Sequence, residues 1–284
     1  MTAKNGAFST SDGCSIAYAI HRAKSGLSRR LVLIHSLALD RSVWDGVVER
    51  LAGQAEILTY DCRGHGQSGR PHMDFTAELF ARDLAELMDH VGWSDATIAG
   101  CSMGGCVAQA FAGLYPARAR ALALIDTTAW YGPDAPKQFR ERAAAAQAKG
   151  MRGLIDFQVT RWFSDTWRQA NADCVARATQ VFRDNDFACY AASCALLGDA
   201  DLRHYLPSFR MPVSVIVGEE DYATPVAMAE SLHAAIRGSS LHILPATRHL
   251  SPLERPSEVT GILGALLGFP FPVPADSRLQ PRLP

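Results

Sequence analysis

A serine enclosed by glycines is the residue in this chain best suited to chemistry. The run GCSMG over residues 100–104 places Ser102 between two glycines, in the pattern G-x-S-x-G. Glycine permits a turn too tight for side chains on either side. Small apolar residues over 96–100 predict a strand before this turn, and residues 104–116 predict a helix after it. A strand–turn–helix setting holds a serine hydroxyl clear of a sheet, so the pattern favours a nucleophile.

A serine hydroxyl is a weak nucleophile at neutral pH and needs a base. His249 follows an apolar run at 240–245, and Asp221 follows another at 213–218. The order serine, acid, histidine along the chain is one in which these three groups are known to cooperate. We expect His249 to accept the proton of Ser102, and Asp221 to orient His249 and stabilise its charged form.

Other side chains compete for these two roles. Asp126 ends an apolar run at 121–126 and is a second candidate for the acid, although an aspartate there commonly caps a helix or loop. Glu219 and Glu220 adjoin Asp221 and are expected in solvent. Four other histidines are expected to be packed or solvated: His65, His72, His233 and His242.

Two backbone N–H groups are needed near Ser102, because acyl transfer places negative charge on the carbonyl oxygen of the substrate. The N–H of Met103, directly after Ser102, is one candidate. The N–H of Leu37 is the other, because it follows the apolar run at the start of the predicted sheet. Only the N–H groups would take part, which leaves these side chains and that of Ser36 to line the pocket.

Short apolar runs and helical periodicity alternate along most of the chain. The runs predict strands at 29–36, 55–61, 96–100, 121–126, 213–218 and 240–245, and the periodicity predicts helices at 76–91, 104–116, 225–238 and 256–269. Thr76 is expected to cap the first of these helices and Gly92 to end it. This alternation predicts an α/β fold with a mainly parallel sheet covered by helices on both faces.

One segment breaks the alternation. Residues 128–206 hold no strand pattern but several helix-like pieces, so we expect a helical cap inserted between two strands of the sheet. The predicted organisation is therefore a core over 1–127 and 207–270, this cap, and an irregular proline-rich tail over 271–284.

Composition excludes several classes of function. The 284 residues carry a formal net charge of −1, which gives no basic field for nucleic acid, and no apolar run approaches the roughly 20 residues that cross a bilayer. No secretory signal is visible, and the seven cysteines form no C-x-x-C pair, which favours reduced thiols in the cytoplasm. We expect a small-molecule substrate, no cofactor and no metal; a homo-oligomer remains open.

The residues around Ser102, Asp221 and His249 together resemble the α/β-hydrolase fold family, over nearly the whole chain. The run YDCRGHGQS at 60–68 is similar to a loop of that family, in which Asp61, Arg63 and His65 are expected to make hydrogen bonds within the loop. A serine nucleophile excludes the members that use aspartate, the haloalkane dehalogenases and epoxide hydrolases.

Within the family the sequence most resembles the 3-oxoadipate enol-lactonases. The shared features are Ser36-Leu37 in the loop that supplies a backbone donor, and the runs GMRGLIDFQVTRWFSD at 150–165, CYAASCALLGDADLR at 189–203 and GEEDYATP at 218–225. The resemblance implies that the chain opens an enol-lactone in aromatic catabolism, through an acyl-Ser102 intermediate hydrolysed by water.

The start of the cap departs from that family's pattern. A tryptophan commonly precedes the arginine there, whereas this chain has Phe139-Arg140. A substrate carrying a free carboxylate would need a cation in the cap, for which Arg140 and Arg161 are candidates. Trp130 and Trp162 are expected to line the pocket or to pack the cap.

The same three residues serve other reactions. A broad carboxylesterase, a C–C bond hydrolase and a cofactor-free perhydrolase share them, and pocket shape decides among these activities. A small-molecule receptor of the same fold is a non-enzymatic alternative, against which the intact Ser102, Asp221 and His249 argue.

Overall fold

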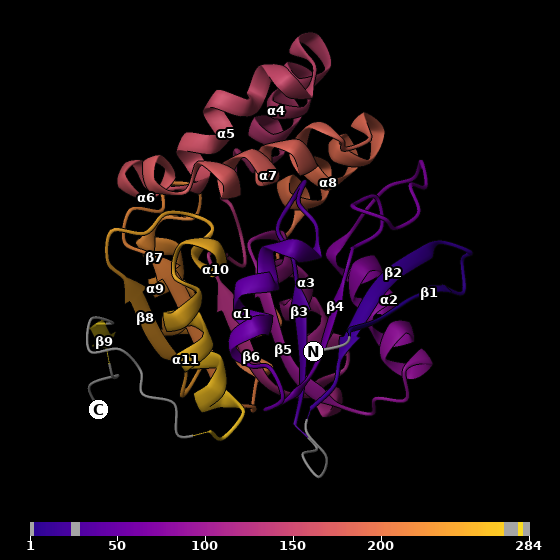
Figure 1. Ribbon diagram of the computed structural model, residues 1–284, viewed down its shortest axis with the longest axis vertical. Helices are drawn as coiled ribbons and strands as arrows, with labels where there is room; N and C mark the ends of the chain where they lie inside the picture. The colour runs from indigo at the N-terminus through magenta and orange to yellow at the C-terminus, as the bar shows by residue number, and fades with distance from the viewer. Residues whose placement is uncertain (1–2, 24–28, 270–277, 281–284) are drawn as a thin grey trace.

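The computed structural model describes residues 3–23, 29–269 and 278–280 and is built on a nine-stranded sheet (Figure 1). The spatial order is β1-β2-β4-β3-β5-β6-β7-β8-β9, and neighbouring strands from β4 to β8 are parallel. The strands are β1 (Ala3–Ser9), β2 (Ser15–His21), β3 (Arg30–Ile34), β4 (Glu56–Tyr60), β5 (Ala96–Cys101), β6 (Ala119–Ile125), β7 (Val213–Gly218), β8 (Ser240–Leu244) and β9 (Arg278–Gln280).

The six predicted strands are confirmed as β3 to β8, and three antiparallel strands at the sheet edges were not predicted. β1 reads AKNGAFS, and none of its residues is buried, so it lacks the apolar run on which the prediction depended. β9 lies in the segment 271–284, which was expected to be irregular throughout. That expectation is wrong for residues 278–280; the rest of the segment lies outside the described residues.

Helices cover both faces of the sheet, as the alternating pattern predicts (Figure 1). The core helices are α1 (Asp45–Arg50), α2 (Ala77–His90), α3 (Met103–Leu114), α9 (Val226–Ala235), α10 (Ser251–Glu254) and α11 (Pro256–Leu266). α1 packs against α11, and α2 packs against α3. Thr76 caps α2 by accepting a hydrogen bond from the N–H of Leu79 at 3.0 Å, and Gly92 follows this helix with φ +75°.

Between β6 and β7 lies the predicted helical segment, which Figure 1 shows gathered at one end of the sheet. Its helices are α4 (Ala135–Lys149), α5 (Ile155–Trp162), α6 (Asp165–Ala170), α7 (Ala172–Arg183) and α8 (Phe187–Asp199). The backbone N–H of Leu250, in the core, donates to the carbonyl of Trp162 at 3.1 Å, which ties this cap to the core. Among the described residues, no helix is both long and apolar enough to cross a bilayer.

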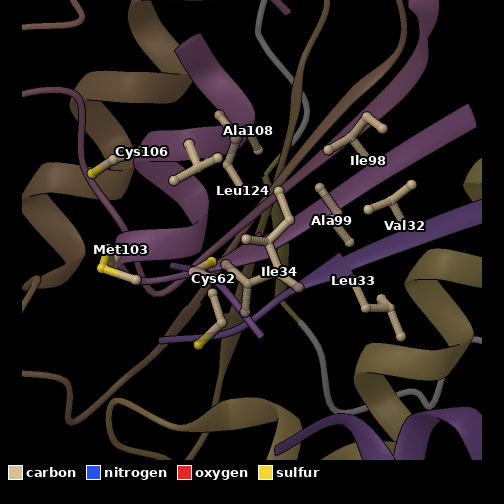
Figure 2. Packing of buried hydrophobic residues seen from close by; sticks show 14 of the residues in the cluster. Val32, Leu33, Ile34, Cys62, Ile98, Ala99, Met103, Cys106, Ala108 and Leu124 are labelled. Atoms are coloured by element: carbon tan, nitrogen blue, oxygen red, sulfur yellow. The ribbon is translucent and has the colours of Figure 1, made fainter. Parts of the chain in front are cut away.

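Figure 2 shows the core where α3 meets the centre of the sheet. Ile34, Ile98 and Leu124 from three neighbouring strands are completely buried there, alongside Cys106 and Ala108 of α3. Such small side chains on the helix let its backbone approach the strands closely, and close packing of this kind stabilises protein interiors.

Two of the three residues expected to make hydrogen bonds within the loop after β4 do so. Asp61 accepts from the backbone N–H of Gln67 at 2.9 Å. The prediction is wrong for the side chain of Arg63, which is buried and donates out of the loop, to Asp83 on α2 at 2.6 Å. His65 is hydrogen-bonded through Nδ1 to the carbonyl of Arg63 at 3.0 Å, and its ring lies 5.1 Å from that of His35. Burial, and then the neighbouring His35, lower the pKa of His65 to about 3, so both rings of this pair stay neutral at neutral pH.

This buried histidine makes the stability of the fold depend on pH. The folded-state pKa lies below the ordinary value of 6.5, so the unfolded chain binds more protons between those two values. Stability contributed by His65 is therefore complete above pH 6.5 and is lost as pH falls. Between pH 7 and pH 5 we expect a loss of about 2 kcal/mol from this residue, at 1.36 kcal/mol per pH unit below 6.5.

Urea unfolding of His65→Gln at pH 7, 6 and 5 measures this contribution. The variant should lose less unfolding free energy than the wild type as pH decreases, because Gln does not titrate. His72→Gln is the control, since the His72 side chain is 72% exposed in the same loop. Parallel profiles for the wild type and His65→Gln would contradict the assignment.

Candidate active site

Ser102 sits at the sharp turn between β5 and α3, as the glycine pattern predicts. Its backbone has φ +55°, which a residue with a side chain rarely adopts. A Cβ on Gly100 would lie 2.0 Å from the carbonyl oxygen of Gly104, and a Cβ on Gly104 would lie 2.3 Å from that of Ile34. The two glycines therefore let the strand and the helix approach closely on either side of the serine.

The structure brings Ser102, His249 and Asp221 into one line of hydrogen bonds. His249 lies between β8 and α10, and its Nε2 is 2.9 Å from the Oγ of Ser102. Its Nδ1 is 2.8 Å from Oδ2 of Asp221, in the loop after β7. Because a carboxylate can only accept, Nδ1 carries the proton, which leaves Nε2 free to accept from the serine hydroxyl.

Asp221 is held as a carboxylate by several donors. Its Oδ1 accepts from the backbone N–H groups of Ala223 at 2.7 Å and Thr224 at 3.0 Å, and its Oδ2 accepts from the Thr224 hydroxyl at 2.8 Å. Burial by itself raises the pKa of Asp221, but the facing His249 and these hydrogen bonds outweigh burial and leave the pKa below its ordinary value. The group is therefore charged where it faces the imidazole.

Asp126, the rival acid, has a different set of partners. Its carboxylate accepts from the backbone N–H of Gly218 at 3.2 Å, and from the N–H and hydroxyl of Ser251 at 2.9 and 2.7 Å. Among the described residues it makes no hydrogen bond to His249. Burial, and then the charge of Asp221, raise the pKa of Asp126 well above its ordinary value. Asp126 therefore joins the end of β7, just before Asp221, to the start of α10, just after His249.

The other competitors lie apart from this line. Glu219 and Glu220 are exposed, as expected. The four other candidate histidines have different surroundings. His65, His233 and His242 are hydrogen-bonded to Arg63, Ser239 and Ser240, and His72 is exposed.

The loop that carries Leu37 is fixed by a buried histidine. His35 Nδ1 donates to the carbonyl of Ser36 at 2.8 Å, and His35 Nε2 accepts from the backbone N–H of Cys62 at 2.9 Å. A trans peptide points its C=O and N–H to opposite sides, so holding the Ser36 carbonyl also fixes the direction of the Leu37 N–H. Ser36 and Leu37 line the same cavity as Ser102.

Ser102 opens into a small cavity of about 20 Å³ between the core and the cap. A larger cavity of about 660 Å³ adjoins it beneath α4 and α5. The residues that line both are Tyr131, Phe139, Arg142, Arg161 and Ala223. Phe157 and Tyr222, which are about half exposed, stand at the larger cavity.

Two arginines stand where these cavities meet. Arg142 donates through Nε to the Tyr190 hydroxyl at 2.9 Å, and Arg161 donates to the carbonyl of Ala223 at 3.5 Å. Neither has a carboxylate within 4.0 Å among the described residues. Burial, and then the charge of Arg142, lower the pKa of Arg161. Two guanidinium groups without counterions next to Ser102 form a site for an anion.

The predictions that Arg140 and Trp130 line the pocket are wrong, because neither residue lines the cavity of Ser102. Arg140 is exposed on α4, because Arg142 lies about 200° further around that helix and takes the inward face. Trp130 is packed under the guanidinium of Arg203, 3.9 Å from its ring centre, and lines a separate cavity. Ser36, Arg161 and Trp162 do line the cavity of Ser102.

Several lining residues were not predicted. The signal that could have found Arg142 is helical phase, since the buried Phe139 lies three positions before it on α4. Tyr131, Gln158 and Leu197 come from three separate pieces of the cap, so no local pattern joins them to Ser102.

Known proteins are similar to this chain over most of its length. A family model described as the alpha/beta hydrolase fold matches residues 29–256. The 3-oxoadipate enol-lactonase 2 of Acinetobacter baylyi is 29% identical over 251 residues, which cover 88% of this chain and 93% of that protein.

Two solved structures are also similar. The enol-lactonase from Burkholderia xenovorans LB400 superposes with a TM-score of 0.88 at 31% identity, covering 93% of this chain and 100% of that one. A thermophilic esterase from Thermogutta terrifontis, with malate bound, superposes with a TM-score of 0.84 at 27% identity, covering 94% and 98%.

Proposed function

The chain belongs to the α/β-hydrolase fold family, and we propose that it is a serine hydrolase which opens a small lactone or ester through an acyl-Ser102 intermediate. The observation that carries this proposal is the line of hydrogen bonds from Ser102 through His249 to Asp221, at 2.9 and 2.8 Å. Enol-lactonase relatives that match nearly the whole chain support an ester or lactone as the substrate.

In the proposed reaction the Ser102 hydroxyl attacks the substrate carbonyl while His249 Nε2 takes its proton. Asp221 stabilises the imidazolium that forms. The negative charge on the carbonyl oxygen is bound by the N–H groups of Leu37 and Met103. His249 then returns the proton to the leaving oxygen. In an ester this step frees the alcohol, and in a lactone it opens the ring, so that the new hydroxyl or enol stays on the acyl group bound to Ser102.

Water completes the cycle. His249 takes a proton from a water molecule, the resulting hydroxide attacks the acyl carbon, and Ser102 leaves with that proton as the free hydroxyl. When the leaving group is an enol, it becomes a ketone after release, which disfavours the reverse reaction. Each turnover consumes one lactone and one water and needs no cofactor.

We propose more narrowly that the substrate carries a free carboxylate, as an enol-lactone of the 3-oxoadipate type does. Arg142 and Arg161 support this, because both cations lie at the cavity of Ser102 without a carboxylate partner in the described chain. The malate bound to the Thermogutta esterase, a small dicarboxylate, agrees with an anionic ligand. The physiological setting we propose is the catabolism of aromatic compounds in the cytoplasm.

A carboxylesterase with a broad range is the second candidate. It is favoured by the larger cavity of about 660 Å³ next to Ser102, where the exposed Phe157 and Tyr222 would contact an apolar alcohol group. The Thermogutta relative, an esterase, points the same way.

Substitution of the three aligned residues tests the mechanism. Ser102→Ala and His249→Ala should each remove most hydrolysis of p-nitrophenyl acetate, and Asp221→Asn should lower kcat about 10⁴-fold by favouring the wrong imidazole tautomer. Circular dichroism should show that each variant stays folded. Asp126→Asn is the matched comparison: if it lowered kcat as far while Asp221→Asn had little effect, the acid would be Asp126.

The choice between lactone and ester is tested by the ratio of two specificity constants. The ratio of kcat/KM for 3-oxoadipate enol-lactone to kcat/KM for neutral p-nitrophenyl acetate should be high in the wild type. In Arg142→Met it should fall about tenfold to a hundredfold, because a charged hydrogen bond to the lactone carboxylate is lost. Arg140→Met, an exposed change on the same helix, should keep the wild-type ratio. A wild-type ratio near one, unaffected by Arg142→Met, would favour the carboxylesterase.

A further inference from the structure

A glutamine on the cap helix α5 lines the cavity of Ser102, and no described residue pairs with its amide. Gln158 is completely buried and lines the cavity of about 20 Å³ into which Ser102 opens. Neither its Nε2 nor its Oε1 has a hydrogen-bond partner among the described residues. Of the described side chains with such unpaired atoms, Gln158 is the one that borders this cavity.

An apolar side chain at position 158 would give a more stable fold than glutamine does. The buried residues of α5 are Gln158 and Trp162, which lie one turn apart and so share the face turned toward the core. A buried amide that makes no hydrogen bond lowers stability, and such groups are rare in native proteins. An unpaired polar group at a cavity thus indicates a partner that is present only when the cavity is occupied.

The neighbouring groups restrict what that partner is. Arg161 follows on the same face of α5, and with Arg142 it offers donors only, so a ligand carboxylate satisfies the arginines but cannot donate to the Gln158 oxygen. A carboxylate or carbonyl oxygen of the ligand can accept from Nε2, but it cannot donate to Oε1. A hydroxyl can donate to Oε1, so a ligand that carries a hydroxyl beside its carboxylate satisfies both ends of the Gln158 amide.

We propose that Gln158 is a specificity residue that hydrogen-bonds a hydroxyl on the acyl part of the substrate, beside the carboxylate held by Arg142 and Arg161. The inference rests on the proposed function and ranks its substrates: among carboxylate-bearing lactones and esters, those with a hydroxyl on the acyl part bind more tightly than those without one, such as 3-oxoadipate enol-lactone. A substrate without the hydroxyl leaves the amide oxygen unpaired in the complex, so it binds less tightly.

Product-like acids that differ by one hydroxyl test this directly. Succinate and the two enantiomers of malate are compared as inhibitors of p-nitrophenyl acetate hydrolysis by the full chain. In the wild type, the better malate enantiomer should inhibit about tenfold to a hundredfold more tightly than succinate. In Gln158→Met, which keeps length but removes the amide, this preference should fall to within about twofold. Gln147→Met, the same change at an exposed position on α4, should keep the wild-type preference.

Thermal unfolding separates this role from a structural one. Without ligand, Gln158→Met should raise Tm by about 2–4 °C, because an unpaired buried amide is removed. A lower Tm would mean that the amide supports the fold, and would overturn the proposal. Equal inhibition by malate and succinate in the wild type would also overturn it, because water would then satisfy the amide.

Ligand binding can also be measured without relying on the hydrolysis assumed in the proposed function. If the wild type hydrolyses no ester, the proposed function fails, but the rise in Tm on adding each acid still reports binding. A larger rise with malate than with succinate, lost in Gln158→Met and kept in Gln147→Met, supports the role of Gln158. Equal rises in all three proteins overturn it.

Discussion

The turn at Ser102 is the constraint on which the rest of the site depends. A residue with a side chain at φ +55° is strained, by an amount of order 1–3 kcal/mol, and it persists because its surroundings fix it. The N–H of Ser102 donates to the carbonyl of Ile125 at 2.8 Å, and its carbonyl accepts from the Thr127 hydroxyl at 2.8 Å. β6 and the residues just after it therefore hold the turn on one side, and the close approach of Gly104 to β3 holds it on the other.

Two aspartates lie near His249, and their different hydrogen-bond partners give them different roles. Asp221 faces the imidazole and keeps a lowered pKa, so its charge is available to an imidazolium. Asp126 is completely buried, has a raised pKa, and hydrogen-bonds the segments that carry Asp221 and His249. One carboxyl group faces the imidazole of His249, whereas the other joins the two loops that carry Asp221 and His249.

Local patterns in the sequence were sufficient to predict the site residues that directly follow strands. Parallel strands end at the same edge of a sheet, so Ser102, Asp221 and His249 could be expected to meet from their places after three apolar runs. The helical cap has no such common edge from which the positions of its side chains could be predicted. Arg140 and Arg142 are two residues apart, and only the phase of α4 against the core decides which one faces the cavity.

Tertiary contacts also determine three features that local sequence patterns did not predict: the orientation of Trp130, the burial of Gln158 and the edge strand β1. Trp130 is turned from the site by its packing on Arg203, more than 70 residues along the chain. Gln158 is a polar residue on the buried face of a helix, where the pattern of α5 alone would favour an apolar one. Edge strand β1 carries too little apolar character to be recognised, because few of its side chains face the core.

In the proposed reaction the Ser102 oxygen becomes covalently acylated during turnover. Rapid acid quench of the enzyme with p-nitrophenyl acetate, followed by peptide mass spectrometry, detects this intermediate. We expect one acetyl group on the peptide that contains Ser102, present in the wild type and absent in Ser102→Ala. Steady release of p-nitrophenol with no acetyl group on that peptide, or with the group on another residue, would contradict it.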